Sequence, residues 1–217
     1  MGHSEIGGGK IAELHLISTG QQSTEALASI IEKVHTYVDV IHLREKLWTD
    51  REMIGAIELL TSRGVPKEKL IVNSRIDVAH VMKIRGVQLT HKSIGVSVVR
   101  NVYDHLKIGC SVHSVDEAIY ASNNGADYLL YGHVFESDSK PGLKPKGLES
   151  LQRVVQSVPI PVIGIGGIMP GNTPDIIKSG AKGIAVLSGV LLSTDPLNTV
   201  IKYKETLQKV SEQESTC

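Results

Sequence analysis

Residues 161–187 read PVIGIGGIMPGNTPDIIKSGAKGIAVL, and this stretch indicates the architecture of the whole chain. Two apolar runs, Pro161–Ile165 and Gly183–Leu187, flank a short helical pattern at Asp175–Lys178. Both runs are apolar at even and at odd positions, which is typical of parallel strands that are buried on both faces. The stretch therefore predicts one strand–helix–strand unit of a parallel sheet.

The same unit recurs along the rest of the chain. Further strands are expected at Ala12–Ser18, Asp39–Arg44, Leu70–Asn73, Gly86–Leu89, Lys107–Ser111 and Tyr128–Tyr131. Helical patterns are expected at Thr24–His35, Asp50–Leu60, Asp116–Ser122, Leu148–Val155 and Leu197–Val210. Repeated strand–helix pairs without an interdomain linker predict the α/β class and a single (β/α)8 TIM barrel. An open doubly wound sheet is the alternative, but it usually carries G-x-G-x-x-G after its first strand, and Ser18-Thr19-Gly20 stands there instead.

Composition excludes several classes of function. The chain of 217 residues has 23 Lys+Arg and 23 Asp+Glu, and its aromatic share is 4%. A nucleic-acid surface needs a basic excess, and a base-stacking platform needs aromatic rings, so we expect no nucleic-acid partner. No apolar run approaches the ~18 residues of a membrane span. The polar N-terminal segment lacks the apolar region of a secretory signal, so a cytoplasmic location without membrane association is expected.

The expected domain organisation is simple. Residues 12–210 should form the single barrel domain, with a flexible leader at 1–11 and a flexible tail at 211–217. Of the two cysteines, Cys110 lies in an apolar segment and Cys217 ends the chain. One should be buried and the other should lie on the tail, so no structural disulfide is expected.

Two glycine-containing clusters follow the last two expected strands. Active sites of barrels lie at the carboxyl ends of the strands, and the loops after the last two strands often bind phosphate through backbone N–H groups. Gly166 and Gly167 follow one strand, and Ser188 and Gly189 follow the next. Glycine lets the backbone approach an anion. The alternative is that these glycines only form turns. The two clusters together, at the ends of the last two strands, nevertheless predict a phosphate site and a small phosphorylated substrate.

The chain has nine histidines, and several fall near expected strand ends. We expect His42, His91, His113 and His133 at the rim, whereas His15 and His80 should pack or form local hydrogen bonds. No H-x-H or H-x-x-E-H spacing and no nearby acidic pair completes a metal-ligand set, so no metal site is expected.

An ordered series of segments resembles the thiamine phosphate synthase superfamily. The similarity extends from Ala12 to about Thr194. It is carried by HLREK (His42–Lys46), VNSRIDVA (Val72–Ala79), GVQL (Gly86–Leu89), GCSVHS (Gly109–Ser114), ADYLLYGHVF (Ala126–Phe135), PVIGIGGI (Pro161–Ile168) and AVLSGV (Ala185–Val190).

Departures from the synthase pattern are informative. The synthases usually carry N-D-R and G-Q-x-D, whose aspartates are Mg²⁺ ligands, and this chain has Ser74 and Ser93 at those positions. Mg²⁺ prefers carboxylate oxygens, so the resemblance implies that magnesium-dependent handling of pyrophosphate is lost. The cationic pair Arg44 and Lys46 is kept, and His133 replaces a proline of the synthases.

This combination resembles the thiazole tautomerases, the TenI branch of the superfamily, which aromatise a thiazole carboxylate phosphate tautomer. The resemblance implies that His133 moves a proton from ring C2 to the exocyclic carbon, without a metal or redox cofactor. A small phosphorylated thiazole is the implied partner. The expected binding residues are Arg44, Lys46, Asn73, Ser111 and Lys140 for the substrate, and Gly166, Gly167, Ser188 and Gly189 for its phosphate.

Two other functions stay open at this point. A synthase that joins pyrimidine and thiazole phosphates would use the retained Arg44, Lys46, Asn73 and Lys140. A non-catalytic regulator on a degenerate synthase scaffold would use the phosphate loops alone. A homodimer is consistent with a barrel of this size.

Overall fold

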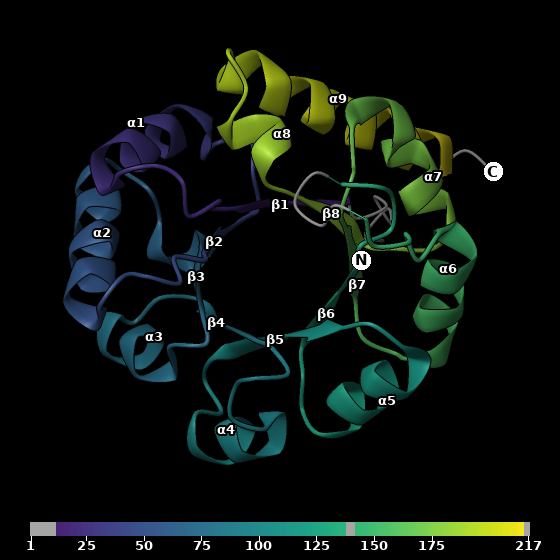
Figure 1. Cartoon of the computed structure of the whole chain (residues 1–217), viewed down its shortest axis with the longest axis horizontal. Helices are drawn as coiled ribbons and strands as arrows, with labels where there is room; N and C mark the ends of the chain where they lie inside the picture. The colour runs from purple at the N-terminus through teal and green to yellow at the C-terminus, as the bar shows by residue number, and fades with distance from the viewer. Residues whose placement is uncertain (1–11, 138–141, 215–217) are drawn as a thin grey trace, which may run out of the picture.

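The computed structural model describes residues 12–137 and 142–214 as a closed barrel of eight parallel strands (Figure 1). Each strand pairs with its two neighbours in chain order, and β8 closes the barrel on β1. This confirms the predicted TIM barrel. The strands are β1 Glu13–Ile17, β2 Val40–Leu43, β3 Leu70–Asn73, β4 Gly86–Leu89, β5 Lys107–Val112, β6 Tyr128–Gly132, β7 Val162–Ile165 and β8 Gly183–Val186.

Helices form the outer ring of the barrel (Figure 1). They are α1 Thr24–Val34, α2 Asp50–Ser62, α3 Ile76–Met82, α4 Val96–Val102, α5 Val115–Asn123, α6 Leu148–Ser157, α7 Thr173–Lys178, α8 Ser188–Leu191 and α9 Pro196–Glu214, with the 3-10 turns η1 Lys67–Lys69 and η2 Pro170–Asn172. The sequence did not predict α3, α4 or α8. Their N-cap residues form no side-chain hydrogen bond to the helix, so the usual start signal is missing.

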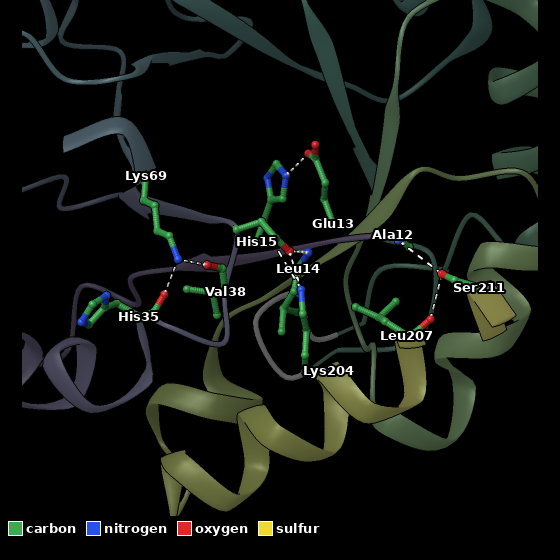
Figure 2. A network of polar contacts seen from close by, with 11 residues as sticks. Ala12, Glu13, Leu14, His15, His35, Val38, Lys69, Lys204, Leu207 and Ser211 are labelled. Carbon is green, nitrogen blue, oxygen red and sulfur yellow. Dashed lines mark hydrogen bonds and ion pairs between the residues drawn. The ribbon is translucent and has the colours of Figure 1, made fainter. Parts of the chain in front are cut away.

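The C-terminal helix corrects one expected boundary. The sequence predicted its end at Val210 and a flexible tail from 211, but α9 continues through Glu214. Leu207 and Val210 are buried, and Ser211 Oγ accepts a hydrogen bond from the Ala12 backbone N–H at 3.4 Å (Figure 2). Packing on the start of β1 therefore extends the helix. The expected leader at 1–11 and the last residues, 215–217, lie outside the described residues.

Both faces of the strands are buried, as the apolar runs predicted. Alternate residues such as Ile17, Val40 and Ile163 pack inside the barrel, while Leu16, Ile41 and their equivalents pack against the helices. None of the described helices is both long enough and apolar enough to cross a membrane.

The expectation for Cys110 is confirmed, because its side chain is 7% exposed. Burial raises the pKa of its thiol to about 12.

Polar contacts hold the amino-terminal end of the barrel (Figure 2). The Leu14 backbone N–H donates to Asp39 at 2.8 Å, and the same carboxylate lies 3.2 Å from Lys204 Nζ of α9. Lys69 Nζ donates to the backbone carbonyls of His35 at 2.7 Å and Val38 at 2.8 Å. These bonds tie β1 and α9 to the segment before β2, and that segment to the turn before β3, so this end has a structural role.

Two histidines lie inside the barrel and form a hydrogen-bonded chain. His15 Nε2 lies 3.1 Å from Glu13 Oε2, and His15 Nδ1 lies 3.0 Å from His42 Nε2. A carboxylate only accepts, so His15 donates from Nε2 and accepts at Nδ1 from His42. The sequence placed His42 at the rim, and this is wrong: it is 1% exposed and bonded to His15. Successive side chains of a strand point to opposite faces, and His42 is at a position of β2 that faces the barrel interior.

This buried pair makes stability depend on pH. Burial lowers the pKa of His15 and lowers that of His42 well below its ordinary value. The unfolded chain therefore binds more protons below about pH 6.5, the ordinary pKa of imidazole. The contribution of the pair to the free energy of unfolding should be fully present above that pH and should be lost as the pH falls toward the lowered pKa values. The loss should be at most ~1.4 kcal/mol per pH unit for each histidine.

The measurement is urea unfolding between about pH 7.5 and 5, flanking the ordinary imidazole pKa. The double variant His15→Leu/His42→Leu should show a shallower decline than the wild type, whereas His91→Ala, at an exposed position, should keep the wild-type slope. Equal slopes in the wild type and the double variant would contradict the assignment.

Candidate functional site

The predicted site residues lie at the carboxyl ends of the strands, which meet at one rim of the barrel. Asn73 ends β3, Ser111 lies near the end of β5, and His133 directly follows β6. Gly166 follows β7, and Ser188 follows β8 and opens α8. Lys140 lies outside the described residues. The parallel barrel thus brings together residues that are widely separated in sequence.

A cavity of about 280 Å³ opens at the ends of β2 and β3. Its lining residues are Arg44, Glu45, Lys46, Asn73, Ser74 and Arg75. The cationic side chains outnumber the single carboxylate, so the cavity favours an anion. Arg75 is held by Asp50 and by the Trp48 carbonyl, and this fixes the loop that carries Lys46.

Glu45 is the carboxylate in this lining, and it is 6% exposed. Its Oε2 lies 3.6 Å from the position that a Cβ on Gly20 would take, and its Oε1 has no hydrogen-bond partner among the described residues. The carboxylate therefore lies against the loop after β1. The Arg44 backbone N–H donates to Ser18 Oγ at 2.8 Å and ties the end of β2 to that same loop.

Hydroxyl groups connect the ends of β3 and β4. Ser74 Oγ lies 2.8 Å from Ser93 Oγ. Ser93 Oγ also lies 3.2 Å from Thr90 Oγ1, and it accepts a hydrogen bond from the Thr90 backbone N–H at 2.9 Å. Ser74 and Ser93, the two positions at which the resemblance expects aspartates, therefore meet in space and hold neutral hydroxyls. Mg²⁺ prefers carboxylate ligands, so this donor set does not fit a magnesium ion. The described residues contain no group of three or more His, Cys, Asp or Glu side chains that could hold a metal ion.

A hydrogen-bonded column leads from the barrel interior to Ser111. The Tyr128 hydroxyl donates to Gln88 Oε1 at 2.7 Å, and Gln88 Nε2 donates to Ser111 Oγ at 3.1 Å. Burial raises the pKa of Tyr128 well above its ordinary value, so this phenol stays protonated. Because Ser111 Oγ accepts from Gln88, its own proton remains available to a ligand.

His133 is a buried side chain at the end of β6, with 6% of its surface exposed. Its Nε2 lies 3.0 Å from the backbone carbonyl oxygen of Leu143. The loop that carries Leu143 returns to the strand end, where the Lys146 N–H donates to the His133 carbonyl at 2.9 Å and the Gly147 N–H donates to the Val134 carbonyl at 3.0 Å. In the closed strand order, β6 lies across the barrel from β2, so His133 and the cationic cavity occupy opposite sides of the mouth.

The glycines after β7 serve loop packing. A Cβ on Gly166 would lie 2.3 Å from His133 Cβ, and a Cβ on Gly167 would lie 2.1 Å from the Glu136 carbonyl oxygen. Both have positive φ angles, +100° and +64°. A Cβ on Gly189 would lie 3.0 Å from the Tyr203 hydroxyl. Close packing against other segments of the same chain is therefore a second reason for glycine at these positions. Phosphate binding by their N–H groups stays a prediction.

Sequence reasoning missed three contributors to this rim. Gln88 and Tyr128 form the column beneath Ser111, and Leu143 bonds His133 through its backbone. A glutamine at an inward position of the apolar run GVQL was a usable signal for the column. No sequence signal marks a backbone carbonyl as a partner of a distant histidine.

Comparison with known proteins agrees with this fold. The family described as thiamine monophosphate synthase matches residues 14–190. A protein of Pyrococcus furiosus named thiamine-phosphate synthase is 35% identical over 198 residues, covering 91% of this chain and 94% of that protein. One of Chloroflexus aurantiacus with the same name is 41% identical over 161 residues, covering 72% and 73%. A solved structure of thiamine phosphate pyrophosphorylase from Pyrococcus furiosus superimposes with a TM-score of 0.78 at 31% identity, covering 92% of this chain and 96% of that one.

The packing of Gly166 on His133 predicts an effect on stability. Gly166→Ala should lower the free energy of unfolding by about 2–4 kcal/mol, because the new Cβ meets His133 and the backbone has a positive φ. Gly171→Ala is the matched control, since among the described residues no heavy atom beyond its chain neighbours lies within 4 Å of its Cβ position. Denaturant unfolding measures both, and equal stabilities of the two variants would contradict this packing.

Proposed function

Because the chain belongs to the thiamine monophosphate synthase family, we propose that it acts on a phosphorylated thiazole as a tautomerase. The observation that carries the proposal is the contact of Ser74 with Ser93 at 2.8 Å. Two neutral hydroxyls take the place of the aspartates that the resemblance assigns to magnesium. The same rim carries the buried His133, which the synthase pattern lacks.

The proposed reaction is an isomerisation that needs only proton transfer. The substrate carries an exocyclic double bond and a hydrogen on ring C2. The neutral imidazole of His133 removes the C2 proton, and the imidazolium returns a proton to the exocyclic carbon, so the ring becomes aromatic. Imidazole is the side chain that most often serves as both the base and the acid of such a transfer. The site must then mainly position the ring.

The two sides of the mouth suit the two ends of such a substrate. The cavity with Arg44 and Lys46 can pair with the carboxylate, or with the negative charge that develops when C2 loses its proton. Asn73 and Ser111 can donate hydrogen bonds to the ring substituents. We assign the phosphate to the backbone N–H groups of the clusters Gly166–Gly167 and Ser188–Gly189, and Ser188 and Gly189 are exposed at the start of α8.

Thiamine phosphate synthase activity is the second candidate. It is supported by the names of the relatives, all of which span most of this chain. Arg44, Lys46 and Asn73, which this activity would use, line one cavity. The donor set at Ser74 and Ser93 counts against it, because pyrophosphate then lacks its magnesium partner. The homodimer and the cytoplasmic location stay predictions.

Replacing the base tests the proposal. In His133→Gln, the side-chain amide can still donate toward the Leu143 carbonyl but cannot accept a proton, so turnover should fall at least ~100-fold. Loss of the C2 hydrogen, followed by NMR in deuterated buffer, measures the rate. His113→Gln, at the end of β5 and bonded to Glu117, is the control and should keep most of the activity.

Retention of the wild-type rate by His133→Gln would contradict the role of this histidine. A wild-type protein that does not exceed the spontaneous rate would contradict the tautomerase proposal and support the binding regulator.

Restoring the carboxylates tests the donor-set argument. The double variant Ser74→Asp/Ser93→Asp should gain Mg²⁺ binding, because it places two carboxylates where the hydroxyls now meet. Calorimetric titration with Mg²⁺ in the presence of pyrophosphate is the measurement. Ser74→Asn/Ser93→Asn, of the same size but neutral, is the matched control. Equal Mg²⁺ affinity of the wild type and the Asp variant would contradict the argument.

A further inference from the structure

The two ring nitrogens of His133 have different surroundings. Nε2 lies 3.0 Å from the Leu143 carbonyl oxygen. Nδ1 has no hydrogen-bond partner within the described part of the chain, and the ring forms its hydrogen bond through Nε2. Among the described residues, the side-chain atoms that are both unpartnered and fully buried are His35 Nδ1, His42 Nδ1 and Glu45 Oε1. Nδ1 of His133 is unpartnered but is not one of these atoms, so it is not fully buried. One nitrogen is thus occupied and the other is open.

The partner of Nε2 fixes the position of a proton. A backbone carbonyl oxygen has no hydrogen to give, so the bond to Leu143 exists only while Nε2 is protonated. Neutral imidazole carries one N–H, and its other nitrogen holds the basic lone pair. With Nε2 donating to Leu143, that lone pair is on Nδ1.

Contacts on several sides hold the imidazole in this orientation. Gly166 packs against His133 Cβ, where it leaves no room for a side chain of its own. The backbone bonds from Lys146 to His133 and from Gly147 to Val134 anchor the returning loop, four residues or fewer from Leu143. The carbonyl acceptor and the ring are therefore parts of one hydrogen-bonded loop, and a ring flip would break the bond to Leu143.

We propose that Nδ1 of His133 is the nitrogen that takes and returns the proton, and that the Leu143 carbonyl is a positioning group that keeps the proton of the resting imidazole on Nε2. This inference rests on the proposed tautomerase function. It adds which nitrogen reacts and what the Leu143 carbonyl does. In this scheme the same nitrogen carries out both proton transfers.

The atoms and electrons balance in this scheme. The C2–H bond breaks, its proton goes to Nδ1, and its electron pair enters the ring. The imidazolium then carries hydrogen on both nitrogens and keeps the Nε2–H bond to Leu143. The electrons of the exocyclic double bond form a new C–H bond with the Nδ1 proton, and the neutral imidazole is restored. No oxidant or reductant is involved.

The first experiment reads the tautomer directly and does not depend on activity. Long-range ¹H–¹⁵N correlation spectra of uniformly ¹⁵N-labelled protein at about pH 8.5, well above the ordinary imidazole pKa, distinguish protonated from unprotonated ring nitrogens. The spectrum of His133→Gln identifies the His133 signals by their loss. We expect a protonated Nε2 and an unprotonated Nδ1. A dominant Nδ1–H tautomer, or equal populations of both, would overturn the inference.

The second experiment blocks each nitrogen in turn. Nδ1-methylhistidine at position 133 carries a methyl group in place of the Nδ1 lone pair, so turnover should fall at least ~100-fold. In its neutral form the remaining lone pair lies on Nε2, so this residue also loses the N–H that donates to Leu143. Nε2-methylhistidine keeps the Nδ1 lone pair but loses the bond to Leu143, and it should retain more activity than the Nδ1-methylated protein. The reverse order would overturn the inference.

The two proposals fail separately. If the wild-type protein shows no turnover above the spontaneous rate, the tautomerase function fails, and the assignment of Nδ1 as the reacting nitrogen is overturned with it. If turnover is present and the spectra show the Nδ1–H tautomer, the function stands and only this inference fails.

Discussion

Parallel pairing around a closed ring is the constraint on which the rest of this structure depends. Since β8 pairs with β1 in the same direction as every other neighbour, all strands end at one rim. In the closed barrel, one face of each strand packs against apolar side chains inside the barrel, and the other face packs against the helices. Polar bonds at the opposite end, such as Lys69 to the carbonyls of His35 and Val38, hold the connections and leave the rim free for chemistry.

The rim divides into two chemically different sides. The ends of β2 and β3 form a cationic cavity bounded by a pair of serine hydroxyls, and the end of β6 carries a buried histidine. An anionic ring compound that bridges the mouth would place one charged end at Arg44 and a reacting carbon near His133. The hydroxyl pair distinguishes this site from one built around magnesium, because neutral oxygens cannot offset the charge of a divalent ion. The family supplies the scaffold, and the substituted residues determine the proposed chemistry.

The sequence predicted the parts of this structure that depend on local pattern. Strands follow from runs that are apolar at both parities, and the rim follows from the barrel. It could not predict contacts whose partners are far apart in the chain. His42 is at an inward-facing position of β2, and it is bonded inside the barrel to His15, which is 27 residues away in the chain. The packing of Gly166 against His133 is such a contact, because the two residues lie on different strand ends. The missed helices α3, α4 and α8 have only four to seven residues, so each presents too few turns for a helical repeat to be recognised.

The central claim is that this member of the family moves protons on a thiazole and does not join two substrates. One preparation, assayed for both reactions, tests it most directly. We expect aromatisation of the thiazole carboxylate phosphate tautomer at the same rate with Mg²⁺ or with a chelator, and no coupling of pyrimidine and thiazole phosphates in Mg²⁺ above the rate without protein. Robust coupling that requires Mg²⁺, with aromatisation no faster than the spontaneous reaction, would contradict the account.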